Sequence, residues 1–146
     1  MKSVSPFLWR RRVGLRDVDA WGVVWYGNYL VYCDEARAEL LRAYGLPPGK
    51  LRESGYIAPA VQLTSRYHAP ARHDDEIDVH VRIPKAKGTR LQFEFTIRRS
   101  ADNTLLAQIS TTSVLIRTNG DLVYLIPEPF KEPIDAMLRS QPQAQP

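Results

Sequence analysis

The chain has 146 residues, of which 44% are apolar and 25% are charged, as is ordinary for a globular protein. This length supports one domain with its own core and is too short for two. No run of about 18 apolar residues is present, so no membrane-spanning helix is expected, and the first residues do not resemble a secretory signal. The single cysteine, Cys33, cannot form an intrachain disulfide, which favours a reducing, cytoplasmic setting.

The formal net charge of +4 at pH 7 favours an anionic partner. The basic residues are dispersed, however. Residues 10–12 form the only run of three arginines, and residues 74–76 form an opposing acidic run. Nucleic-acid-binding modules carry denser basic faces with interleaved aromatic residues. We therefore expect no nucleic-acid partner.

The first half of the chain predicts a strand, a loop and one long helix. Residues 7–15 favour a first strand that ends near Gly14. Residues 28–44 carry apolar side chains at three- and four-residue spacing, which is typical of an amphipathic helix. Glycines and prolines in residues 45–49 end this helix, because proline cannot continue the hydrogen-bond ladder.

The second half predicts an antiparallel sheet of four or five strands. Apolar and polar residues alternate, which places the apolar side chains of each strand on one buried face. Short connections at residues 87–89 and 101–103 favour hairpins. The predicted strands are residues 61–68, 77–83, 91–98, 105–117 and, as a last short one, 122–124.

The C-terminal part contains a proline-rich segment, residues 127–133, followed by a predicted short helix at 134–139. The tail, residues 141–146, has no large apolar side chain and is expected to be disordered. The sequence therefore predicts a single domain over residues 1–135 and a tail over 136–146. Because one helix cannot cover a long sheet, a second subunit is expected to complete the cover.

Residues 16–29 carry the strongest functional signal. Two aspartates and two glycines stand on an aromatic-rich turn that leads directly into the predicted helix. The first N–H groups of a helix lack internal partners, and the helix dipole adds positive character there. A carboxylate beside such donors could attack a carbonyl and stabilise the resulting oxyanion. Composition alone favours a turn-forming or helix-capping role for Asp19 over a catalytic one, because aspartate is common in both positions.

The segment from Asp17 to Leu30 resembles the signature of hotdog-fold thioesterases of the 4-hydroxybenzoyl-CoA thioesterase family. In that family an Asp-x-Asp-x-x-Gly-x-Val turn precedes an aromatic pair and an Asn-Tyr that opens the helix. The resemblance continues at residues 35–37, 45–48 and 67–75 and covers about residues 7–130. The pair Trp25-Tyr26 is similar to the aryl-CoA enzyme, whereas residues 67–72 are closer to the Tol-Pal-associated branch that acts on short-chain acyl-CoAs.

The resemblance implies an α+β hotdog fold, in which a five-stranded antiparallel sheet wraps a long central helix. It implies hydrolysis of short-chain or aromatic acyl-CoA thioesters to free acid and CoA, without metal or redox cofactor. It also implies a homodimer that assembles into a homotetramer, with the CoA-binding loop often supplied by the neighbouring subunit. Two alternatives are a non-catalytic acyl-CoA or acyl-carrier-protein binding module and a hotdog dehydratase or hydratase.

The family pattern assigns roles to individual residues. It makes Asp19 the nucleophile or general base and makes the backbone N–H of Tyr26 the donor to the thioester carbonyl. Asp17 is then a structural carboxylate that bonds to the turn or pairs with Arg16 or Arg37. The residues implied in substrate binding are Trp25, Gly27, Asn28, Lys87, Thr89 and Arg90.

Other chemistries find less support in the sequence. The histidines and cysteine lack the close spacing of metal ligands. No Gly-x-Ser-x-Gly elbow of a serine hydrolase is present. Cys33 falls within the predicted helix and not at its start, so a buried packing role is expected for it.

Overall fold

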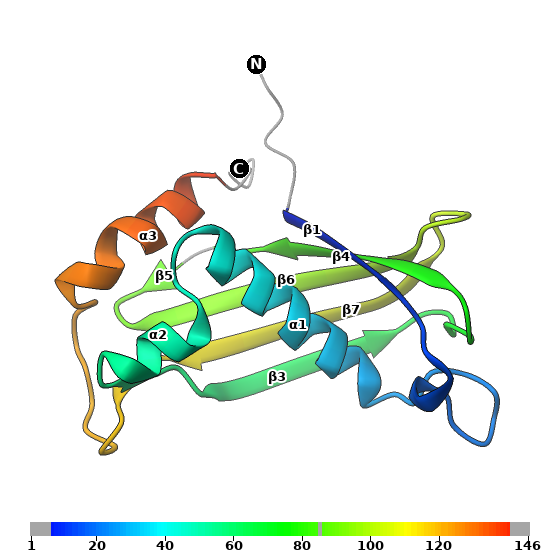
Figure 1. The fold of residues 1–146 in the computed structure, drawn as a ribbon, viewed down its shortest axis with the longest axis horizontal. Helices are drawn as coiled ribbons and strands as arrows, with labels where there is room; N and C mark the ends of the chain where they lie inside the picture. The colour runs from blue at the N-terminus through cyan, green and yellow to red at the C-terminus, as the bar shows by residue number, and fades with distance from the viewer. Residues whose placement is uncertain (1–6, 85, 141–146) are drawn as a thin grey trace.

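A long antiparallel sheet with one helix laid across its face forms the framework of the molecule (Figure 1). The computed structural model describes residues 7–84 and 86–140. The helix α1, Asn28–Ala43, ends within one residue of the predicted position. The α+β hotdog architecture expected from the sequence is confirmed. The predicted C-terminal tail, residues 141–146, lies outside the described residues.

The main sheet has the strand order β1-β4-β6-β7-β3, and the short β5 pairs with β6. Every neighbouring pair is antiparallel. A separate two-stranded sheet joins β2, Tyr56–Ile57, to β8, Ile116–Arg117. The strands of the main sheet are β1 Phe7–Arg12, β3 Ala60–Tyr67, β4 Glu76–Arg82, β5 Ala86–Lys87, β6 Arg90–Arg99 and β7 Leu105–Val114.

The core lies between α1 and the sheet. The inward face of the helix carries Tyr32, Cys33, Ala36 and Leu40, all at most 3% exposed. Across from them lie the alternating apolar residues of β4 and β6, including Ile77, Val79, Val81, Phe93, Phe95 and Ile97. Burial also raises the pKa of the Cys33 thiol, and its predicted packing role is confirmed.

The chain between α1 and β3 differs from the sequence prediction. It contains an additional helix, α2, Pro48–Glu53. The sequence does not predict this helix, because the prolines at residues 47–48 indicate only where the preceding helix ends. Proline is tolerated in the first turn of a helix because the N–H that it lacks has no partner there. The same residues therefore end one helix and begin the next.

The C-terminal elements also differ. The predicted strand over residues 105–117 is two strands, because the chain leaves the main sheet at Leu115 and continues as β8. The predicted strand at residues 122–124 is wrong, since only an isolated bridge between Leu122 and Ile116 forms there.

Helix α3, Glu128–Arg139, begins six residues before the predicted start and crosses the predicted domain boundary at residue 135. Its buried residues Phe130, Ile134 and Met137 recur at helical spacing and face the core. This apolar contact stabilises the helix even though Pro133 stands inside it.

Strand β3 is an open edge of the sheet. Among the described strands it pairs only with β7, and all eight of its residues are exposed. Three of them have large apolar or aromatic side chains: Val61 is 55% exposed, Leu63 46% and Tyr67 44%. An open strand edge with apolar side chains is a template for pairing with another chain.

None of the described helices is long and apolar enough to cross a membrane.

Candidate active site

The aspartate-rich segment forms a small hairpin that leads into α1. A short 3-10 helix at Leu15–Asp17 opens it. Val18 and Val24 form an antiparallel bridge, and the Asp19 carbonyl accepts the Gly22 N–H at 3.0 Å. Gly22 has φ 77°, a left-handed conformation that glycine adopts without strain. The hairpin therefore places Asp19 in the loop that leads into α1.

The two carboxylate oxygens of Asp19 differ in their surroundings. Oδ1 accepts the Trp21 backbone N–H at 2.8 Å, a local bond that fixes the side chain. In the part of the chain that the structure describes, Oδ2 accepts no hydrogen bond. Asp19 thus forms the turn contact considered above and also keeps one oxygen available. The side chain is partly exposed, so a substrate could reach it.

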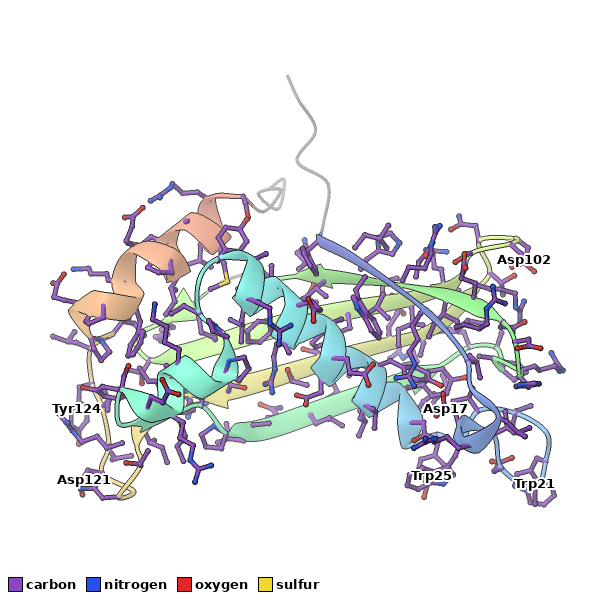
Figure 2. All side chains as sticks on the ribbon, viewed as in Figure 1. Asp17, Trp21, Trp25, Asp102, Asp121 and Tyr124 are labelled. Carbon is purple, nitrogen blue, oxygen red and sulfur yellow. The ribbon has the colours of Figure 1, made fainter. Side chains whose placement is uncertain are left out.

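Asp17 is buried and engaged on several sides (Figure 2). Its Oδ2 accepts the Gly14 N–H at 3.0 Å and the Tyr32 hydroxyl at 2.9 Å, and Arg11 lies 3.4 Å away. The ion partner is therefore Arg11, and not Arg16 or Arg37 as considered from the sequence. Burial and the Asp17 carboxylate raise the pKa of Tyr32. These contacts tie β1, the hairpin and α1 together.

The start of α1 presents two free donors. Among residues 7–84 and 86–140, the backbone N–H groups of Tyr26 and Gly27 donate to no protein acceptor. Gly27 is the N-cap and supplies no capping side chain. A Cβ at Gly27 would lie 2.3 Å from the Trp25 ring, so glycine is needed here for close approach. Two adjacent unpaired donors at a helix start can hold developing negative charge.

Tyr67 was not assigned a role from the sequence, yet it bonds to the peptide that links Tyr26 and Gly27. Its hydroxyl donates to the Tyr26 carbonyl at 2.9 Å, and its ring packs edge-on against Tyr29 at 5.4 Å between centroids. The Tyr29 hydroxyl in turn accepts the Ala71 N–H at 3.0 Å. The Tyr26 carbonyl and the Gly27 N–H belong to one planar peptide. Tyr67 therefore fixes the orientation of one of the two donors.

The implied substrate-binding residues are divided between two regions. Trp25 and Tyr26 are about half to two-thirds exposed beside the hairpin, with ring centroids 5.1 Å apart. The Asn28 amide instead bonds to the Asp17 carbonyl at 2.8 Å, so it supports the loop. Lys87, Thr89 and Arg90 belong to the hairpin between β5 and β6, at the opposite end of the molecule (Figure 1). One chain does not bring the two regions together.

The histidines have local partners. His68 lies 2.9 Å from the Gln108 amide oxygen, and His73 lies 3.5 Å from Asp74. Within the described residues, no group of three or more His, Cys, Asp or Glu side chains could hold a metal ion.

Comparisons with family models and with known proteins all indicate a thioesterase or esterase family. The model of the thioesterase-like superfamily matches residues 13–134. A putative esterase of Aquifex aeolicus is 32% identical over 118 residues, 81% of this chain and 90% of that protein. The acyl-CoA thioester hydrolase YbgC of Escherichia coli is 34% identical over 114 residues, 78% of this chain and 84% of that protein.

A solved structure supports the same family. The 1,4-dihydroxy-2-naphthoyl-CoA thioesterase of Synechocystis has a TM-score of 0.81 at 27% identity, and the match covers 88% of this chain and 95% of that one. Fold, hairpin and helix start together define a hotdog-fold protein of the thioesterase type. The chain belongs to the thioesterase-like superfamily.

Proposed function

We propose that this thioesterase hydrolyses acyl-CoA thioesters with Asp19 as the reacting carboxylate. The observation that carries the proposal is that residues 19–27 contain both an Asp19 carboxylate oxygen that accepts no hydrogen bond from the described residues and two backbone N–H groups without a protein acceptor. The names of the relatives YbgC and 1,4-dihydroxy-2-naphthoyl-CoA hydrolase support CoA thioesters as the substrate class.

The proposed chemistry has two forms that differ in the attacking atom. In the general-base form, Asp19 takes a proton from water, whose oxygen attacks the thioester carbon. In the nucleophilic form, an Asp19 oxygen attacks and forms a mixed anhydride, which water then hydrolyses. In both forms the Tyr26 N–H donates to the developing oxyanion, with the Gly27 N–H as a second donor, and the C–S bond breaks to release CoA as the thiol.

The acyl group is proposed to be either short or aromatic. Trp25 and Tyr26 form an exposed aromatic pair at the helix start, which would suit a flat acyl group. The relatives named above divide between an acyl-CoA hydrolase and a naphthoyl-CoA hydrolase.

We also propose that the protein is cytoplasmic, which is consistent with its single, buried and unpaired cysteine.

We further propose that the working unit is a homodimer, assembled into a homotetramer, in which two β3 edges pair. Support comes from the open β3 edge and its exposed apolar residues. Antiparallel pairing about a twofold axis would bring the α1 start of one copy beside the Lys87–Arg90 hairpin of the other. A basic hairpin suits the phosphates of CoA.

Thiol release from a panel of CoA thioesters tests the proposed activity. The panel contains acetyl-, butyryl-, octanoyl-, palmitoyl-, benzoyl- and 1,4-dihydroxy-2-naphthoyl-CoA, and free CoA is detected with a disulfide dye. We expect turnover of at least one short-chain or aromatic member. Tight binding of the panel without thiol release would instead establish a non-catalytic acyl-CoA-binding module.

A further inference from the structure

An apolar cavity of about 260 Å³ is lined by residues of α2 and α3, which lie at the end of the molecule opposite the start of α1 (Figure 1). The C-terminal half of α1, the helices α2 and α3, and the ends of β6 and β7 enclose it. A concave, mostly apolar pocket with a few polar groups is typical of a site for a small organic molecule. The main apolar walls are Leu41, Leu51, Tyr56, Phe93, Phe130 and Ile134.

The charged residues of the wall are all basic. Arg37 and Arg52 line the cavity, and no aspartate or glutamate among residues 7–84 and 86–140 does. Arg37 is already paired with Asp34 at 2.5 Å, and it lies 3.4 Å from the buried Ser113 hydroxyl. Arg52 lies in the last turn of α2 and is exposed. Among the described residues it forms no ion pair, so its guanidinium is available to a ligand.

The volume limits the size of the ligand. A cavity of about 150 Å³ holds a ligand the size of benzene, so a volume of about 260 Å³ suits a somewhat larger one. This is the size of a medium-length alkyl tail or a single substituted ring. A carboxylate on such a tail could form two parallel hydrogen bonds with a guanidinium at the cavity mouth.

We propose that this cavity binds a small organic carboxylate, with its apolar tail inside and its carboxylate on Arg52. Within one chain the cavity is separate from Asp19, because the 16-residue α1, about 24 Å long, lies between them. In the proposed dimer, Thr89 of the cavity wall would lie near the α1 start of the second copy. The proposal stands on the cavity alone and does not require thioester hydrolysis. If the proposed function is correct, the acids that it releases belong to the same chemical class as this ligand.

Calorimetric titration of the whole protein with octanoate tests the proposal. We expect one octanoate to bind per chain, and octan-1-ol and octylamine to bind about tenfold more weakly because they lack the anionic head. Arg52→Gln should weaken octanoate binding about tenfold as well. The matched control is Lys50→Gln, which removes the same charge from the same helix at a residue outside the cavity wall, and it should leave binding unchanged.

Methyl NMR of the unmodified protein locates the ligand without any variant. Octanoate should shift the methyl signals of Leu51, Leu91, Leu115, Ile126 and Ile134, and Ala58→Phe, which fills the cavity, should abolish these shifts. The proposal is overturned if these signals do not respond to millimolar octanoate, or if octan-1-ol binds as tightly as octanoate. Thiol release from CoA thioesters, measured on the same preparation, reports separately on the proposed function.

Discussion

Tyr67 and Tyr26 are separated by 41 residues in the sequence but joined by one hydrogen bond in the fold. The bond holds the peptide that carries the Gly27 N–H, one of the two unpaired donors at the helix start. Oxyanion donors are effective when they are fixed before the reaction begins. Tyr67 is therefore a positioning residue in the proposed mechanism, because its hydroxyl is directed to the backbone and not to the substrate.

The variant Tyr67→Phe should lower kcat about three- to tenfold, the effect of losing one neutral hydrogen bond of about 1 kcal/mol. KM should change little, since the ring and its contact with Tyr29 remain. Steady-state kinetics with the preferred CoA thioester measures both quantities. Tyr44→Phe, which removes a hydroxyl from the other end of α1, is the control. An unchanged kcat in Tyr67→Phe would show that the peptide needs no such support.

Sequence reasoning predicted the local part of the site but not its long-range contacts. The turn character of residues 16–29 and the helix start at Asn28 follow from local patterns of glycine, aspartate and apolar spacing. The Arg11–Asp17 pair and the bond from Tyr67 join residues on different strands and helices. Their alignment depends on strand register and helix placement, which no local pattern specifies.

At the scale of elements, β1 is attached to β4 by a charged cross-strand pair. Arg10 and Asp78 are register partners, and the Arg10 Nε donates to Asp78 Oδ1 at 2.6 Å. This hydrogen bond, together with one from the Ser100 hydroxyl, holds the pKa of Asp78 below its usual value. A carboxyl group with a lowered folded-state pKa stabilises the fold above its unfolded-state pKa, and this contribution is lost as the pH falls through the folded-state value.

The wild-type protein should therefore lose stability between about pH 5 and pH 2 partly through Asp78. In Asp78→Asn this part of the loss should disappear, so the melting temperature should depend less steeply on pH in that range. Thermal denaturation followed by circular dichroism at several pH values measures the slope. Asp121→Asn, in an exposed turn (Figure 2), is the control and should keep the wild-type slope. Equal slopes in all three proteins would contradict this assignment.

The two helix errors, the missed α2 and the late predicted start of α3, have one physical cause. The prolines at residues 47–48 and 127–133 indicate the end of a helix or a loop, yet Pro48 and Pro129 lie in the first turn of α2 and α3. Whether such a segment becomes helical depends on what its apolar residues can contact. Phe130 and Ile134 reach the core only because α1 and the sheet leave room at that end of the molecule. Long alternating strands were predicted well because their burial pattern is local.

At the scale of the whole molecule, the proposed catalytic hairpin and the basic β5–β6 hairpin lie at opposite ends (Figure 1). The open β3 edge runs between these ends. A twofold pairing through β3 would build each substrate site from two copies, which accounts for both the exposed apolar edge and the separation of the two regions. Activity should then depend on assembly.

The double variant Val61→Lys/Leu63→Lys should be monomeric and inactive, because lysines on a strand edge oppose pairing. Light scattering gives the mass, and thiol release gives the activity. Leu8→Lys, which places a lysine on the other edge strand at a similarly exposed residue, should remain assembled and active. A wild-type protein that is monomeric and fully active would contradict the proposed assembly.

The central claim is that the Asp19 carboxylate performs the reaction. It is tested most directly by comparing kcat of the wild type and Asp19→Asn on one CoA thioester, with substrate binding measured separately. Asparagine can keep the turn contact with the Trp21 N–H but cannot act as a base or a carboxylate nucleophile. We predict that kcat falls at least about a hundredfold while binding and melting temperature are retained. A variant that keeps wild-type kcat would remove Asp19 from the mechanism.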